Sequence, residues 1–362
     1  MISKHYYTLK EAQKSIMNDT TNNERVFTGK TKILEFGTWI PEQIIENGIV
    51  LAPLFKALSL NLDDMIRKTG VAQRCKSDDS VSVLDMAEHA VKDLMSRTNT
   101  KDIAISEIDT IIYASVTRMM AEPSTAIMLQ KRLGIESAIS FDISNACLSF
   151  VDGLIVADSL ISAGRSKLAL VVSAEKGARV AEMSLDAMTN KEAGMECMAA
   201  LTLGDGAAAA LVAADDSAYK GAIALRAFTR ASRSQYAHCC TLQSTNEPMM
   251  TDSNAMFEGA LLNYPPMLKT LIKELGWNIE DIEALVPHQA SLKVIQTGLK
   301  SIGYPIEKTI ITLDQFGNMA SVSVPFTISR LLDQQKPATG SKIAVAAFGS
   351  GLSFSMLALE VL

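Results

Sequence analysis

Apolar runs alternate with segments of helical periodicity along most of the chain. Residues 108–117 (IDTIIYASVT) and 168–175 (LALVVSAE) are nearly continuous in β-branched and apolar residues, whereas the stretches between such runs read as helices that end at glycine. Strands buried in a parallel sheet have the first pattern, and helices packed on that sheet have the second. The chain is therefore predicted to have an α/β fold with a largely parallel sheet.

The order of these predicted elements occurs twice. The first copy contains the strand IDTIIYASVT, a helix ending in LQKRLGI, the strand within ISFDISNAC, an apolar helix that stops at Gly164 and the strand LALVVSAE. The second copy repeats that order with the strand in IEALVPHQAS, a helix ending in GLKSIGY, a strand within IITLDQFGNMA, the segment SVSVPFTISRLLDQQ and the strand IAVAAFGSG. We predict a duplicated fold with pseudo-two-fold halves at 31–215 and 216–362, preceded by an N-terminal extension at 1–30. Two unrelated strand–helix units are the alternative. Superposing the copies places Cys147 opposite Met319 and beside Asn318.

Composition narrows the function classes. With 362 residues, 48% hydrophobic and 20% charged, the chain can bury a large core. A net charge of −6 argues against a general nucleic-acid binder. The first residues lack an apolar signal core, and the longest apolar runs stop short of the ~20 residues of a membrane span. We expect a soluble cytoplasmic protein without a membrane segment, and its five cysteines, which form no spaced framework, to be reduced thiols.

Cys147 stands between the strand-like ISFDISNA and the apolar stretch LSFVDGLIVADSLISAG. This order places a cysteine at the buried N-terminus of a helix, where the aligned peptide dipoles favour a thiolate and lower the thiol pKa. We therefore expect Cys147 to be a nucleophile. The alternative is a cysteine that only packs in the core, because free cysteines are among the most buried residues.

Two further polar residues are predicted to converge on this cysteine. His288 follows the strand EALVP, and Asn318 lies in a Gly-Asn turn ahead of a helix. Both therefore fall at strand ends, where parallel sheets build their sites. Together the three residues would supply a nucleophile and two hydrogen-bond donors for a thioester oxygen. Taken singly, His288 could be a core histidine and Asn318 a turn residue.

Six motifs carry a family resemblance. They are TGVAQR (69–74), SNACLSF (144–150), LTLGDGAAAALV (201–212), VPHQAS (286–291), FGNMASVSVP (316–325) and AFGSGL (347–352). The chain resembles the thiolase superfamily and, within it, the ketoacyl-acyl carrier protein synthase III branch. The resemblance implies a thiolase fold of five layers, αβαβα, and a homodimer.

The resemblance also implies a reaction. It is a ping-pong Claisen condensation in which Cys147 is acylated by an acyl-coenzyme A or acyl carrier protein thioester, so acyl-CoA and acyl carrier protein are the expected partners, with no separate cofactor and no metal. His288 and Asn318 match the rest of the family's Cys-His-Asn triad. The backbone N–H groups of Cys147 and Ser350 match its oxyanion hole.

Glu122 decides the finer prediction. The segment from Glu122 to Thr125 resembles that of thiolase-like enzymes of long-chain olefin biosynthesis and of pyrone-forming ketosynthases. In those relatives a glutamate reaches across the dimer and deprotonates the second acyl chain. The expected reaction is thus non-decarboxylative, giving a β-ketoacyl product or a pyrone. If Glu122 is only a helix-start residue, the alternative is a decarboxylating synthase that uses a malonyl thioester in fatty-acid or polyketide biosynthesis. A catalytically silent partner subunit of a heterodimer is a third possibility.

Methionine is abundant, with 18 in the chain against only 6% aromatic residues. Flexible thioethers suit apolar channels for acyl chains, and they fill gaps in large cores equally well. The methionines that we assign to substrate channels are Met119, Met120, Met249 and Met250.

Two local clusters complete the candidate residues. Arg67 and Lys68 precede the TGVAQR motif, so we expect them near the pantetheine entrance, in contact with a phosphate; a solvated basic face is the alternative. His238-Cys239-Cys240 suggests a metal site, but adjacent cysteines lack the usual spacer and no second ligand pair is apparent. We therefore predict no metal.

Overall fold

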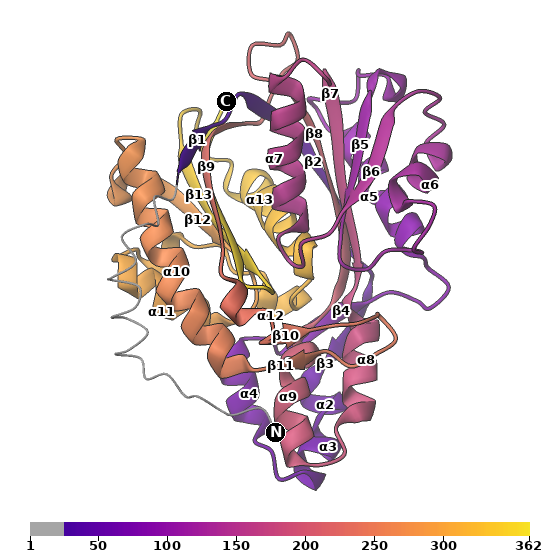
Figure 1. Ribbon diagram of the computed structural model, residues 1–362, viewed down its shortest axis with the longest axis vertical. Coiled ribbons are helices and arrows are strands. Elements are labelled where there is room, and N and C mark those ends of the chain that lie inside the picture. The colour runs from indigo at the N-terminus through magenta and orange to yellow at the C-terminus, as the bar shows by residue number, and fades with distance from the viewer. Residues whose placement is uncertain (1–24) are drawn as a thin grey trace.

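The computed structural model describes residues 25–362 and consists of two half-sheets with a layer of helices between them and one outside each (Figure 1). Ten strands form one sheet in the order β12-β13-β14-β9-β2-β8-β7-β5-β6, with β1 paired to β9. The first half-sheet contains β2 (Thr31–Trp39), β5 (Thr110–Ala114), β6 (Ile139–Ile143), β7 (Leu168–Lys176) and β8 (Asp205–Ala214). The second contains β9 (Ile223–Ser232), β12 (Ile282–Pro287), β13 (Lys342–Gly349) and β14 (Ser353–Val361).

Three apolar layers follow from this arrangement. Helices α7 (Ser149–Ser162) and α13 (Ser323–Gln335) lie between the half-sheets and share one core with their facing strands. Helices α5 (Val83–Ser96) and α6 (Thr125–Arg132) cover the outer face of the first half-sheet, and α10 (Ser253–Glu274) and α11 (Leu292–Ile302) cover that of the second. The predicted five-layer thiolase fold is confirmed.

Strand order reveals the duplication. When the strands of each half are numbered in chain order, the first half-sheet has, from its outer edge inwards, the third (β6), second (β5), fourth (β7), fifth (β8) and first (β2) strand. Strand β5 is parallel to both β6 and β7. The second half-sheet repeats this order without its third strand, of which a single parallel bridge, Leu285 to Thr309, remains.

The strand predicted within IITLDQFGNMA is therefore wrong. The Gln289 side chain replaces a neighbouring strand as the hydrogen-bond partner of this segment. Its Oε1 accepts from Thr312 N at 3.0 Å, and its Nε2 donates to Ile310 O at 3.2 Å. The chain then forms the short helix α12 (Leu313–Phe316).

Smaller elements gather at one end of the two half-sheets (Figure 1). Several of them share a separate apolar cluster that includes Leu51, Phe55 and Met188. The elements are β3 (Gln43–Glu46), α2 (Asn47–Val50), α3 (Ala52–Ala57), α4 (Leu62–Thr69), β4 (Gln73–Lys76), α8 (Gly177–Ala187), α9 (Lys191–Cys197), β10 (Cys240–Thr241) and β11 (Met250–Thr251).

Part of the expected N-terminal extension belongs to the sheet. Strand β1 (Val26–Thr28) pairs antiparallel with β9, while residues 1–24 lie outside the described part of the chain. The boundary expected near residue 215 falls in the connection between β8 and β9. Between residues 25 and 362, no helix combines the length and apolar character needed to cross a membrane.

Candidate active site

Cys147 lies in a tight turn between β6 and the first residue of α7. Ala146 adopts a φ of +50°, which L residues seldom occupy, so the turn must be held by its neighbours. Ser149 Oγ accepts from Asn145 N at 2.9 Å and donates to Ala146 O at 2.7 Å. Cys147 is thereby placed just ahead of a helix, as its sequence context predicts.

The electrostatic surroundings of this thiol differ from the expectation. Burial raises the pKa of Cys147, and the nearby Cys240 thiol and Glu175 carboxylate add to the rise. The predicted lowering of the thiol pKa by the helix start is therefore wrong. Loss of hydration disfavours the thiolate by more than the backbone N–H groups of one helix turn stabilise it. In the resting chain the thiol is protonated.

The turn that follows β13 packs directly on the start of α7. A Cβ added at Gly349 would lie 3.1 Å from Cys147 N, 3.2 Å from Leu148 N and 3.4 Å from Ala146 Cβ. Only glycine allows this close approach without a shift of the neighbours. Ser350 is the next residue, so the two expected oxyanion donors come from segments in contact.

His288 follows β12 and is held by the neighbouring strand β13. Its backbone N donates to Ala346 O at 2.8 Å, and its ring packs edge-on against Phe348 with centroids 5.3 Å apart. The side chain is buried, and burial lowers the pKa of His288 to about 4. Ring nitrogen Nδ1 has no hydrogen-bond partner within residues 25–362. The imidazole is therefore neutral near pH 7.

Asn318 is fixed by hydrogen bonds on its backbone and on its carbonyl oxygen. Its N–H donates to Thr202 O at 2.8 Å, its backbone oxygen accepts from Gly204 N at 3.0 Å, and its Oδ1 accepts from Ala320 N at 3.0 Å. Because Oδ1 is engaged, the orientation of the amide is set, and its NH₂ group is the end left to donate.

Sequence reasoning missed a fully buried carboxylate next to these loops. Glu175 accepts from Val116 N at 2.9 Å, Thr117 N at 3.0 Å and Thr117 Oγ1 at 2.8 Å, and also from Ser321 Oγ. Burial raises the pKa of Glu175. It joins the loop that leads to Glu122 to the segment after Asn318. The available signal was an acidic residue at the end of the buried strand LALVVSAE.

Glu122 is exposed and lies outside α6. The helix begins at Thr125 with Ser124 as its N-cap, and the Asp142 carboxylate accepts from Thr125 N and Ala126 N at 2.8 Å each. The helix-start role that was the alternative for Glu122 is thus filled by other residues. Within residues 25–362, Glu122 makes no hydrogen bond or ion pair.

The expected channel methionines do not gather at one place. Met119 and Met120 are exposed, Met250 packs with the cluster around Met188, and Met249 packs with Leu242 beside another small cluster.

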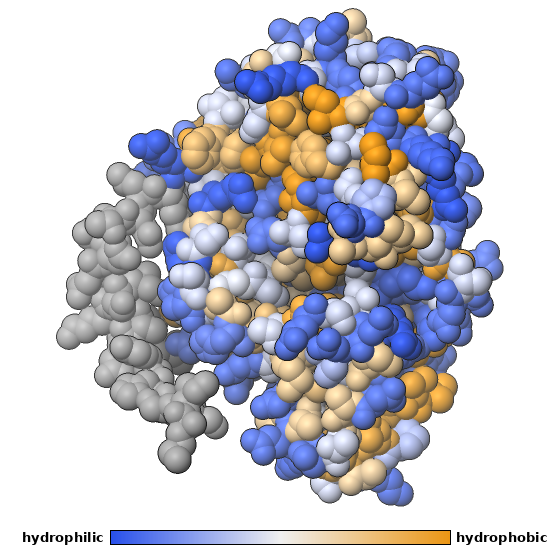
Figure 2. All heavy atoms as spheres, turned by 45° about the vertical axis from the view of Figure 1, so that its right-hand side comes forward, coloured by the Kyte–Doolittle hydropathy of each residue, from blue (hydrophilic) through white to orange (hydrophobic). Residues whose placement is uncertain are grey.

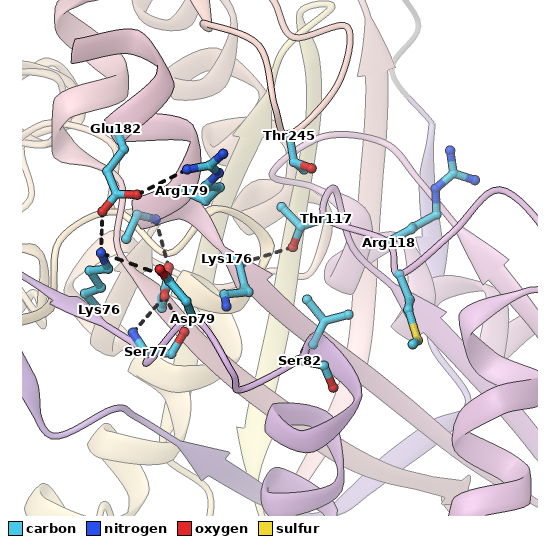
Figure 3. Close-up of a pocket in the computed structure, with 14 residues that line it drawn as sticks. Lys76, Ser77, Asp79, Ser82, Thr117, Arg118, Lys176, Arg179, Glu182 and Thr245 are labelled. Carbon is cyan, nitrogen blue, oxygen red and sulfur yellow. Dashed lines mark hydrogen bonds and ion pairs between the residues drawn. The ribbon is translucent and has the colours of Figure 1, made fainter. Parts of the chain in front are cut away.

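Met119 borders a cavity of about 490 Å³, and charged side chains, including Lys76, Arg179 and Glu182, make up half of its lining residues (Figure 3). Ion pairs join Glu182 to both Lys76 and Arg179. Cys147, His288 and Asn318 do not line this cavity.

Arg67 and Lys68 lie on α4, exposed and both paired with Asp64 at 2.5 Å. The Lys68 carbonyl accepts from Ser291 Oγ at 3.0 Å, so α4 abuts the loop that follows His288. The entrance role of Arg67 and Lys68 stays a prediction.

The His238-Cys239-Cys240 cluster does not form a metal site in this structure. Cys239 is buried, with its Sγ 3.7 Å from His238 Nε2. Over the described range, no group of three or more His, Cys, Asp or Glu side chains is arranged to hold a metal ion.

Comparison with known proteins assigns the family. Models for 3-oxoacyl-(acyl-carrier-protein) synthase III match residues 141–230 and, for its C-terminal part, 272–361. The beta-ketoacyl-(acyl-carrier-protein) synthase III of Deinococcus deserti is 30% identical over 328 residues, covering 89% of both chains. That of Bacillus pumilus is 30% identical over 331 residues, covering 91% of this chain and 98% of its own. The chain belongs to the synthase III family of the thiolase superfamily.

Solved structures agree with this membership in the synthase III family. Xanthomonas campestris OleA, in a cysteine-to-serine variant with bound lauric acid and lauroyl-CoA, superposes with a TM-score of 0.86 at 26% identity, covering 92% of this chain and all of that one. The synthase III of Xanthomonas oryzae gives a TM-score of 0.84 at 26% identity, covering 92% and 99%. The protein is therefore an acyltransferase of the ketosynthase type.

Proposed function

We propose that this ketosynthase joins two acyl thioesters by Claisen condensation without decarboxylation. The observation that carries the proposal is Glu122. Its carboxylate is exposed, lacks a partner among residues 25–362, and follows a loop that Glu175 holds at Val116 and Thr117. A simple acyl thioester must lose an α-proton before it can attack, so the reaction requires a positioned base.

A second subunit would supply the base to each site. Strand β6 is an unpaired edge of the sheet, and Ile127 on α6, Ile139 on β6 and Met119 are exposed apolar side chains on this side. Figure 2, with this side turned forward, has apolar patches among the polar atoms. An edge strand with apolar neighbours favours pairing with another chain. A homodimer formed here would carry Glu122 towards the partner's site.

The proposed reaction has two steps. The Cys147 sulfur attacks the first acyl thioester while its thiol proton passes to the leaving sulfur, so the acyl-enzyme forms and coenzyme A or the carrier protein leaves as the free thiol. Glu122 of the partner subunit then takes the α-proton of the second thioester, and the resulting carbanion attacks the acyl-cysteine carbonyl. The tetrahedral oxyanion accepts hydrogen bonds from Cys147 N–H and Ser350 N–H, each worth about 3 kcal/mol in such sites. Its collapse releases a β-ketoacyl thioester and the Cys147 thiolate, which then recovers the proton that Glu122 took.

His288 and Asn318 would bind the oxygen of the second thioester. The neutral imidazole has one N–H, and a proton on the buried Nδ1 would lack an acceptor. The tautomer with hydrogen on Nε2 therefore costs less and leaves that N–H to donate. The NH₂ group of Asn318 is the second donor.

The second candidate is a decarboxylating synthase, which the relatives' names favour. One experiment separates the two reactions: the enzyme is incubated with isotope-labelled lauroyl-CoA, with and without a malonyl thioester, and the products are read by mass spectrometry. We expect a product with two intact labelled chains in the absence of malonyl. A product formed only with malonyl, and extended by that unit, would contradict the proposal. A catalytically silent subunit would show no acylation of Cys147 at all.

A further inference from the structure

A buried carboxylate lies directly behind the turn that carries Cys147. Asp152, on the first turn of α7, is only 4% exposed. Its Oδ2 accepts from Asn145 Nδ2 at 2.7 Å and from an Arg230 guanidinium nitrogen at 2.8 Å, and Ser355 Oγ lies 3.5 Å from its Oδ1. A charge at such a depth is costly unless it is paired and hydrogen-bonded, so these partners offset the cost.

The partners of Asp152 come from segments that are distant in the sequence. Asn145 belongs to the turn before α7, Arg230 to β9 and Ser355 to β14. Strand β14 starts immediately after the turn that contains Ser350. One side chain therefore connects the segment that supplies the Cys147 N–H to the strand that follows the Ser350 N–H.

The contact between these two segments tolerates little movement. The position of a Cβ on Gly349 would be only 3.1 Å from Cys147 N, so the turn and the helix start are already at their closest approach. Hydrogen-bond donors for an oxyanion must be held to within a fraction of an ångström, because a misplacement of about 1 Å can cost on the order of 100-fold in rate.

A second aspartate on the same helix provides a comparison. Asp158 is also 4% exposed, and its Oδ1 accepts from Lys30 N and Thr31 Oγ1 at 2.8 Å each. These two partners lie at the start of β2, away from the Cys147 turn. Loss of either carboxylate should affect stability, but only Asp152 is hydrogen-bonded to the turn that carries Cys147.

We propose that Asp152 is a positioning residue, which holds the Cys147 turn and β14 in register so that the two N–H groups of the oxyanion hole point at one oxygen. The inference rests on the proposed role of Cys147 as nucleophile. Asp152 itself does not touch the substrate.

Asp152→Asn and Asp158→Asn form a matched pair for the test. The rate of Cys147 acylation by lauroyl-CoA is followed by intact-protein mass, alkylation by iodoacetamide is followed in parallel, and the melting temperature is recorded. For Asp152→Asn we expect acylation to slow by about 10- to 100-fold and alkylation to change by less than about threefold, since alkylation forms no oxyanion. Asp158→Asn should acylate at the wild-type rate.

Other results overturn the inference. Wild-type acylation in Asp152→Asn would reduce Asp152 to a structural role, and equal slowing of acylation and alkylation would place its effect on the thiol itself. If Asp152→Asn does not fold, Arg230→Met replaces it, because the Arg230 side chain is 43% exposed; unchanged acylation in that variant contradicts the inference as well. Absence of acylation in the wild-type enzyme would instead refute the proposed function.

Discussion

At the scale of single residues, burial controls the charge state of the site. The pKa of Cys147 is raised and that of His288 is lowered to about 4, in both cases because the charged form loses its hydration. Both groups are therefore neutral near pH 7. The Glu175 carboxyl group is also buried beside the site, and the four hydrogen bonds that it accepts offset the cost of its burial.

The pKa of His288 predicts how stability depends on pH. Because the folded pKa lies below the ordinary value of 6.5, the unfolded chain binds a proton between about pH 6.5 and pH 4 that the folded chain does not. Stability therefore falls as the pH drops through this range, by up to about 3 kcal/mol from His288 alone.

Urea unfolding of wild type and of His288→Asn across this range measures the effect. The variant should lose stability less steeply towards acid, while buried carboxylates contribute equally to both proteins. Parallel curves for the two proteins would refute the low pKa of His288.

At the level of secondary structure, the first turn of α6 is capped by residues other than Glu122. Ser124 and the Asp142 carboxylate supply the acceptors that the first N–H groups of a helix need. Glu122 is then free of the helix, although the sequence Glu-Pro-Ser-Thr is compatible with a helix start.

Stability measurements can test this division of roles. Asp142→Ala should destabilise the protein by about 1–2 kcal/mol, because it removes two accepted hydrogen bonds and the favourable charge at the helix start. Glu122→Ala should change the free energy of unfolding by less than about 0.5 kcal/mol. Both are measured by urea unfolding at one protein concentration. A larger loss for Glu122→Ala than for Asp142→Ala would return Glu122 to a structural role.

The sequence patterns predict the elements better than the contacts between them. The periodicity of β7 and of α7 and the glycine at the end of each unit predict the layers and the duplication, and the positions of Cys147, His288 and Asn318 at strand ends follow from the same patterns. The missing third strand of the second half could not be foreseen, because it depends on the Gln289 side chain reaching Ile310 and Thr312. Asp152 was overlooked because a single acid in an apolar helix gives no hint of its partners.

At the scale of the whole molecule, each site would be composite, with Cys147 from one subunit and Glu122 from the other. Co-expressed Cys147→Ala and Glu122→Ala subunits should therefore regain condensation, which neither variant shows alone. Random pairing gives one working site in half of the dimers, so we expect about a quarter of the wild-type activity.

The control for this experiment pairs Cys147→Ala with His288→Ala. Cys147 and His288 act in the same site of one subunit, so every site of the mixed dimer lacks one of them and activity should stay absent. Product formation is measured with lauroyl-CoA on the whole purified population of dimers, without separation of mixed dimers from the two homodimers. If the Cys147→Ala and Glu122→Ala mixture stays inactive, Glu122 does not act across subunits.

The position of β14 has a consequence for synthesis on the ribosome. This strand ends at Val361 and yet lies inside the second half-sheet, between β13 and β9. N-terminal parts of a chain emerge and fold first. The thiol of Cys147 is thus made well before the Ser350 turn that packs on it, and the second half-sheet closes only after residues 353–361 have left the ribosome. A nascent chain that has not yet reached Ser350 therefore carries the cysteine without the second N–H group of the oxyanion hole.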